Sequence, residues 1–185
     1  MKRLMRTLMP TLLICLLAPA AVVFAQDNSP KAVSAQAAQA TDSGAKKAFE
    51  KLKTLTGSWQ GTIMRIPINF TIRAVSSGTA ILHEGDTSEA GPPKHEITMF
   101  YLEGDRLLAT HYCDAGNRAR WEGKMSPDGK AIEFSFLEVV GSTRGGYLKD
   151  MVITMIDADH HTVAFTFVMP DGKPIQLRGE FKRTN

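Results

Sequence analysis

The feature that most constrains the fold of this 185-residue chain is a series of about ten short segments in which apolar and polar residues alternate. In one segment, for example, Ile68, Phe70 and Ile72 are separated by Asn69 and Thr71. Alternation with a period of two is typical of β-strands with one buried face. We expect strands at residues 58–64, 67–75, 79–88, 94–102, 106–113, 118–125, 131–138, 147–156, 162–169 and 174–183.

Turn sequences such as Glu103-Gly104-Asp105 and Pro170-Asp171-Gly172 separate these segments, and no helical pattern interrupts them. Short turns between successive strands indicate an up-and-down antiparallel order. Such a sheet removes its exposed edges most simply by closing into a barrel. We therefore predict an all-β fold, a single up-and-down antiparallel barrel of about ten strands. A two-sheet sandwich is the alternative, although it needs longer crossing connections than most of these turns supply.

A short helix is expected before the first strand. In residues 45–55, Phe49, Leu52 and Leu55 fall on one face of a helix, and lysines occupy most of the others. The tripeptide Gly57-Ser58-Trp59 follows directly. A Gly-x-Trp at the start of a many-stranded antiparallel chain indicates a closed barrel in which the indole fills one end.

The first 25 residues have the features of a secretory signal peptide. Lys2, Arg3 and Arg6 precede an apolar stretch that two prolines interrupt, and a small-residue cleavage site precedes Gln26. An uncleaved N-terminal anchor is the alternative. We expect an exported protein, periplasmic or secreted, without stable membrane insertion after the signal is cleaved. Residues 26–44 are rich in Ala, Gln and Ser and predict a flexible linker, so the barrel domain would cover residues 45–185.

Removal of the signal changes the charge of the chain. Of its 22 basic residues, three lie in the signal, which leaves 19 basic and 19 acidic residues and a net charge of zero. This balance argues against nucleic acid as a partner. Cys113 is then the one remaining cysteine, so the mature chain has no internal disulfide.

The helix, Gly57-Ser58-Trp59 and a basic residue near the end of the last strand resemble the calycin superfamily, which includes lipocalins, fatty-acid-binding proteins and nitrobindin-like barrels. In calycins an arginine at that place packs across the tryptophan. Arg183 shares its parity with Leu177 and Phe181, which we expect to face inward. The resemblance therefore implies that Gly57, Trp59 and Arg183 close one end of the barrel.

A closer resemblance covers roughly residues 46–184. The segments 99–105, 110–118 and 157–161 are similar to a family of exported bacterial lipocalin-like proteins of uncharacterised function. Because nitrobindin-like barrels hold haem through a histidine, the resemblance makes His160 and His161 candidate haem ligands. We expect two consecutive turn residues to point into solvent instead, and we expect no bound cofactor.

The densest group of polar residues lies between Thr110 and Arg120. His111 and Cys113 should share one face of their strand, and Tyr101 on the preceding strand could face them. This arrangement suits the lining of a ligand site, a metal site, a thiol whose pKa the histidine lowers, or simple filling of the interior. Ligand lining and structural filling are the favoured interpretations of these residues.

The sequence therefore predicts an exported lipocalin-like barrel that binds a small, mostly apolar ligand. The expected ligand-binding residues are Met99, Tyr101, His111, Cys113, Trp121, Phe134, Phe136 and Phe165, with Phe70 and Phe167 also in the interior. The alternative is an enzyme or a metal- or haem-binding redox protein that uses His111 and Cys113. Because the sequence has no nucleophile elbow, phosphate loop, paired-cysteine metal motif or dinucleotide fingerprint, an enzyme is the less expected class.

Overall fold

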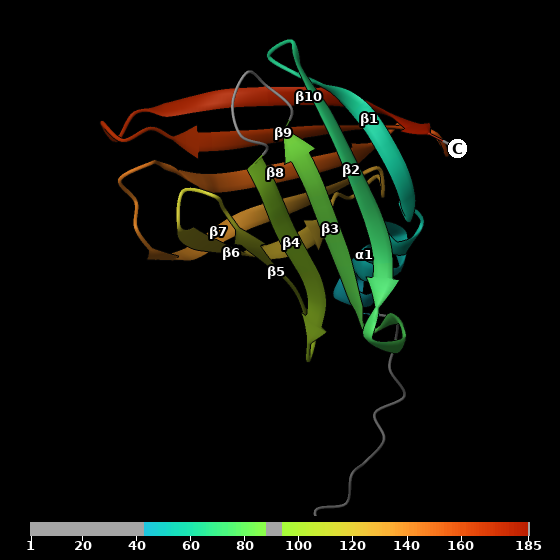
Figure 1. Cartoon of the computed structure of the whole chain (residues 1–185). Helices are drawn as coiled ribbons and strands as arrows, with labels where there is room; N and C mark the ends of the chain where they lie inside the picture. The colour runs from blue at the N-terminus through green and yellow to red at the C-terminus, as the bar shows by residue number, and fades with distance from the viewer. Residues whose placement is uncertain (1–42, 88–93, 185) are drawn as a thin grey trace, which may run out of the picture. The chain divides into compact units, whose positions relative to one another are not determined.

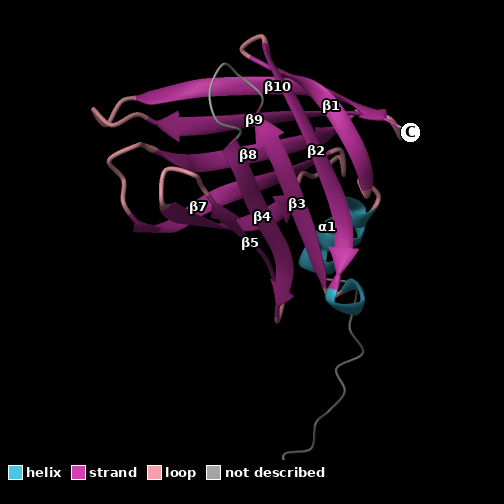
Figure 2. Ribbon diagram, viewed as in Figure 1, coloured by secondary structure: helices cyan, strands magenta, loops and turns pink. Residues whose placement is uncertain are grey.

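The computed structural model describes residues 43–87 and 94–184, all within one compact unit of the chain. The predicted signal peptide, nearly all of the predicted linker, and residues 88–93 and 185 lie outside the described residues. Helix α1 (Gly44–Lys53) comes first, and ten strands follow it (Figures 1 and 2). Their bounds are β1 (Gly57–Ile63), β2 (Ile66–Val75), β3 (Ala80–Thr87), β4 (Lys94–Glu103), β5 (Arg106–Tyr112), β6 (Asn117–Met125), β7 (Ala131–Gly141), β8 (Tyr147–Met155), β9 (His160–Val168) and β10 (Pro174–Thr184).

The strands form a closed barrel, so the prediction of an up-and-down barrel is confirmed and the sandwich alternative is wrong. Each strand pairs antiparallel with the next along the chain, and β10 pairs with β1 to close the ring. Nine of the ten connections between ring neighbours are therefore local, as the short turns require.

Helix α1 contributes its apolar face to the core of the barrel and contacts β4, β5 and β6. Its buried residues Ala48, Phe49 and Leu52 belong to the same core cluster as Leu107 and Trp121 of the barrel. At its N-terminus the Ser43 hydroxyl accepts a hydrogen bond from the Lys46 amide (3.2 Å), which satisfies one of the unpaired amides of the first turn.

Trp59 and Arg183 lie together where α1 meets the barrel. The Trp59 indole is 1 % exposed and donates a hydrogen bond to the Leu55 carbonyl (2.8 Å). The Arg183 guanidinium lies over that ring, with its central carbon 4.4 Å from the ring centroid. It also donates hydrogen bonds to the carbonyls of Thr54, Thr56 and Ala158. Arg183 therefore joins the end of α1, the start of β1 and the β8–β9 turn.

Gly57 is the residue that permits this close approach. Its φ of 141° is one that side-chain-bearing residues rarely adopt, and a Cβ at this position would collide with the Arg183 guanidinium. The two residues of Gly-x-Trp thus have separate structural roles. Gly57 leaves space for the Arg183 guanidinium, and Trp59 provides the ring against which the guanidinium packs.

The barrel is filled at this end and across its middle. Large side chains that are at most 5 % exposed meet there, among them Trp59, Phe70, Phe100, Leu107, Trp121, Ile132, Phe134 and Phe181. Gly123 on β6 leaves room for the Phe134 ring, since a Cβ there would lie 2.6 Å from it. Any interior site must therefore lie toward the opposite end of the barrel, where β4, β6, β8 and β10 begin.

Candidate functional site

We call the end of the barrel opposite Trp59 and Arg183 the open end. The strand pairing contains a gap there. β7 pairs with β8 only from Ala131 to Phe134, although β7 continues to Gly141. Beyond Phe134 the ladder is replaced by a side chain, because the Phe136 amide donates to the Asp150 carboxylate (3.4 Å). The two strands thus separate toward the open end. Phe136 of β7 and Tyr147 of β8 lie where they separate, and their ring centroids are 5.7 Å apart.

Two side chains of β6 satisfy backbone carbonyls across this gap. The Trp121 indole donates to the Lys149 carbonyl (2.8 Å), and the Asn117 amide donates to the carbonyls of Ser142 (3.0 Å) and Gly146 (2.8 Å). Buried carbonyls without a partner are costly, so these bonds fix the start of β8 without a β7 partner. Side-chain hydrogen bonds therefore stabilise the gap in place of the missing strand pairing.

Apolar side chains that face inward at the open end are only half-buried. They come from four adjacent strands: Phe136 on β7, Leu148 and Met151 on β8, Phe165 and Phe167 on β9, and Leu177 on β10. At the filled end most inward apolar side chains of the same size, such as Trp59, Phe100 and Leu107, are at most 3 % exposed, and only those near the strand ends, Leu102 and Met125, are half-buried. The open end thus presents an apolar interior surface that the chain itself does not cover.

The residues that the sequence predicted at the ligand site fall into two groups in the structure, one in the filled core and one at the open end. Trp121 and Phe134 face inward but are 0 and 1 % exposed, so they belong to the filled core. Phe136 and Phe165 face inward at the open end and are half-buried, and His111 also faces inward and is 5 % exposed. Cys113 follows the end of β5 and is half-buried.

Met99 and Tyr101 differ from the expected facing. Tyr101 pairs with Leu108 and Met99 with Thr110, whereas His111 pairs with Thr98. Neighbouring residues of a strand face opposite sides, so Met99 and Tyr101 lie on the outer surface, where the Tyr101 hydroxyl is 3.3 Å from the Thr110 hydroxyl. Tyr101 therefore does not face His111.

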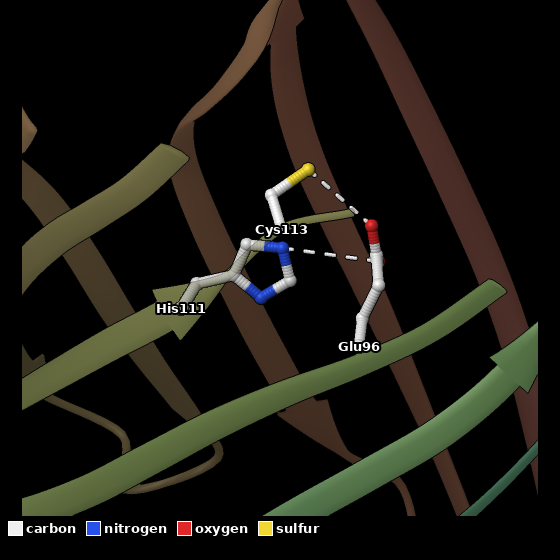
Figure 3. Close-up of side chains that lie close together, drawn as sticks. All are labelled: Glu96, His111 and Cys113. Carbon is white, nitrogen blue, oxygen red and sulfur yellow. Dashed lines mark hydrogen bonds and ion pairs between the residues drawn. The ribbon is translucent and has the colours of Figure 1, made fainter. Parts of the chain in front are cut away.

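The inward neighbours of His111 on β4 are Thr98 and Glu96, and sequence reasoning missed both. The His111 Nδ1 lies 2.9 Å from the Thr98 hydroxyl, and its Nε2 lies 3.8 Å from a Glu96 oxygen. The Cys113 thiol donates to the other Glu96 oxygen (3.3 Å). Figure 3 shows the three side chains converging from β4 and from the end of β5. Their ligand atoms all lie within 4.8 Å of one another.

The electrostatics of this cluster disfavour a reactive thiolate. Burial, and then the neighbouring His83, lower the pKa of His111 to about 4, so His111 is neutral near pH 7 and forms no ion pair with Glu96. Burial, with a smaller effect of the Glu96 carboxylate, raises the pKa of Cys113 to about 12. His111 thus does not lower the pKa of the thiol, in contrast to one sequence-based interpretation. The pKa of Glu96 is raised by burial and by the Asp114 carboxylate.

Two further histidines lie inside the barrel, and the sequence indicated neither. His161 is 1 % exposed and packs between Trp59, Phe70 and Phe181, with its ring centroid 4.2 Å from that of Trp59. His83 on β3 lies against Phe70, with ring centroids 4.5 Å apart. Burial lowers the pKa of each to about 4.

The expectation that His160 and His161 both point into solvent is wrong for His161. β9 already begins at His160, so the two side chains point to opposite faces: His160 is exposed and contacts Asp157 (2.9 Å), and His161 enters the core. Since aromatic rings enclose the imidazole of His161, a haem iron could not reach it without displacing them. The residues present do not fit a haem site at this pair.

A hollow of about 620 Å³ lies on the outer surface of the barrel, over β1, β2 and β10. Gln60, Asn69 and Lys182, which share one outward-facing row of these strands, contribute to its lining. It opens to solvent on the far side of the sheet from Glu96 and Phe165, so we do not assign the interior site to it.

Comparison with known proteins supports the fold alone. No protein-family model matches the chain, and no curated protein matches it. The crystal structure of Rv2717c from M. tuberculosis has a TM-score of 0.59 at 15 % identity and covers 75 % of this chain and 98 % of its own. A protein of unknown function from the DUF3598 family of Nostoc punctiforme has a TM-score of 0.48 at 14 % identity, over 72 % of this chain and 49 % of its own. Bovine odorant binding protein, in complex with a selenium-containing odorant, has a TM-score of 0.35 at 13 % identity, over 72 % and 73 %.

The likeness to Rv2717c is one of fold, and it assigns no activity. Within residues 43–87 and 94–184, no helix is long and apolar enough to cross a membrane.

Proposed function

We propose that this chain is an exported protein whose barrel binds one small, mostly apolar molecule at its open end. The observation that carries the proposal is the contrast between the two ends of the interior. At one end Trp59, Arg183 and α1 seal a filled core, and at the other Phe136, Phe165 and their neighbours remain half-exposed. The N-terminal signal features support export.

The physical argument rests on apolar area. Burying an aromatic or aliphatic side chain stabilises by roughly 1.5–3 kcal/mol relative to leaving it in water. Several inward side chains at the open end have not gained this in full, and a ligand that covers them would supply the remainder. Small-molecule sites are usually concave and apolar with a few polar groups, and the Glu96, Thr98 and His111 cluster lies at the same end.

The test uses N-phenyl-1-naphthylamine, an uncharged apolar probe whose fluorescence rises when it leaves water. We expect one saturable site, and we expect Phe136→Ser to weaken binding about tenfold, since it removes one aromatic contact of roughly 1.5 kcal/mol. Leu137→Ser is the matched control, because Leu137 is the next residue of β7, faces outward and is 41 % exposed. Equal affinity of the two variants, or no saturable binding, would contradict the proposal.

A further inference from the structure

We propose that Glu96, His111 and Cys113 form a binding site for one divalent transition-metal ion of the zinc class. This site goes beyond apolar ligand binding and does not depend on it. The argument rests on the chemistry of the three donors, on their spacing, and on an unsatisfied nitrogen at the centre of the cluster.

The donor set is one that zinc prefers. A thiolate, an imidazole and a carboxylate are the three common protein ligands of Zn²⁺, at about 2.0–2.3 Å from the metal, so that tetrahedral ligand atoms lie roughly 3.3–3.8 Å apart. Glu96 lies 3.3 Å from the Cys113 sulfur and 3.8 Å from the His111 Nε2 through its two oxygens. The three ligand atoms all lie within 4.8 Å of one another, so side-chain movements of about 1 Å or less would bring them to this spacing.

The register of β4 and β5 explains why the three groups meet. His111 faces Thr98 across the ladder, and Glu96 lies two residues before Thr98 on the same inward face. Cys113 lies two residues after His111, where the chain leaves β5. Glu96 and His111 therefore lie on two paired strands of the barrel wall. Cys113 follows directly on the end of β5, where its amide donates a hydrogen bond to the Asn117 carbonyl (3.0 Å).

The His111 Nε2 is the independent observation that points to a ligand. His111 is only 5 % exposed, and its Nε2 atom is buried without a hydrogen-bond partner among the described residues. A buried polar atom without a partner is unfavourable, because it has lost its hydrogen bonds to water and gained none in the protein. A metal ion at the centre of the cluster would accept the lone pair of this nitrogen and remove that cost.

Thr98 gives His111 the tautomer that metal binding requires. If Nδ1 carries the proton and donates to the Thr98 hydroxyl (2.9 Å), Nε2 presents its lone pair to Glu96 and Cys113. Metal-bound histidines nearly always donate their second ring nitrogen in this way. Thr98 is thus a positioning residue of the proposed site.

The charges nearby also favour a cation. The Glu96 carboxylate is half-buried and lies near that of Asp114, and the Cys113 thiol lies within 3.7 Å of an Asp114 oxygen. On metal binding the thiol releases its proton to solvent, and the sulfur becomes a thiolate ligand. Three protein ligands leave a fourth position for water or for a donor atom of a bound molecule, as in non-structural zinc sites.

The test is a titration of the metal-stripped full-length protein with Co²⁺, followed by competition with Zn²⁺. We expect one equivalent of Co²⁺ to produce the intense visible bands of a tetrahedral site together with a sulfur-to-cobalt charge-transfer band in the near ultraviolet. Zn²⁺ should abolish both.

Variants separate this site from adventitious binding. Cys113→Ser should remove the charge-transfer band, Glu96→Gln should weaken Zn²⁺ binding, and Thr98→Val should weaken it about tenfold while the band remains. The control is His95→Gln, which disrupts another histidine–carboxylate pair on β3 and β4, the exposed contact of His95 with Asp86 (2.7 Å).

A wild-type protein that binds no equivalent of Co²⁺ or Zn²⁺ would overturn the proposal. Binding that survives both Cys113→Ser and Glu96→Gln would overturn it as well, because the ion would then lie elsewhere. Cys113 and Glu96 are half-buried, so both variants should fold, and circular dichroism confirms this before the titration.

Discussion

Replacing Arg183 by methionine should destabilise the barrel at its sealed end. Methionine keeps an unbranched stem that can pack on Trp59, but it lacks the guanidinium. The variant therefore loses the contact with the indole ring and the hydrogen bonds to the carbonyls of Thr54, Thr56 and Ala158. The end of α1 would lose its connection to the last strand.

The magnitude follows from these contacts. The three carbonyls belong to exposed residues, so we assign each bond the lower part of the usual range, roughly 0.5–1 kcal/mol. The cation–π contact adds about 0.5–1 kcal/mol. The ion pair with Asp159 adds little, because the Asp159 side chain is 62 % exposed. The free energy of unfolding should thus fall by about 3 kcal/mol, which for a chain of this size lowers the Tm by about 10 °C.

Urea unfolding followed by tryptophan fluorescence measures this loss, since Trp59 and Trp121 are the two tryptophans of the chain. Arg178→Met is the matched control, because Arg178 lies on the exposed outer face of the same strand. That variant should change the free energy of unfolding by no more than about 0.5 kcal/mol. The reasoning is refuted if Arg183→Met is as stable as the wild type, or if the two variants lose the same amount.

Two other predictions concern the interior. Trp121→Phe removes the donor to the Lys149 carbonyl, so the free energy of unfolding should fall by about 1–3 kcal/mol. Hydrogen exchange of the backbone amides at the start of β8 should become faster, and unchanged exchange there would argue against the bond. Burial lowers the pKa of His161 to about 4, with smaller effects of His83 and Arg183, whereas in the unfolded chain it lies near 6.5. The unfolded state therefore binds more protons between these values, and the free energy of unfolding should decrease as the pH falls from 6.5 to 4. His83 and His111 contribute in the same direction, because burial lowers their pKa values to about 4 as well. His161→Gln should therefore reduce the slope in urea titrations without abolishing it, and a slope as steep as that of the wild type would show that His161 does not contribute.

The barrel itself could be predicted from the sequence because its signals are local. Alternation of apolar residues and the turn sequences between them depend on neighbours along the chain, and each predicted strand overlaps an observed one. The contact of Arg183 with Trp59 was implied by the calycin resemblance, and the pleat of the strand supplied only the parity of Arg183 with Phe181. The structure has the two side chains in contact.

The facing of β4 could not be predicted, because both of its faces carry apolar residues. Met99 and Tyr101 alternate as well as Phe100 and Leu102 do, so the sequence pattern does not say which pair enters the barrel. The register of the β4–β5 hairpin decides it, by setting Thr98 opposite His111. Glu96 was missed for the same reason, since its inward position depends on that register.

His161 was misjudged because the start of β9 is set by tertiary pairing. The segment Asp157-Ala158-Asp159 is typical of a turn, and the histidines appeared to extend it. In the structure His161 pairs with Phe181 on β10 and Met155 on β8. This two-sided pairing turns its ring into the core, and no property of the neighbouring sequence reveals it.

The central claim is that the open end of the barrel holds a small apolar molecule. The most direct measurement is denaturing-solvent extraction and mass spectrometry of the protein purified from the organism that makes it. We expect one small, mostly apolar compound in near-stoichiometric amount with the wild type, and much less with Phe136→Ser. Recovery of no such compound from the wild type, or of equal amounts from both proteins, would contradict the claim.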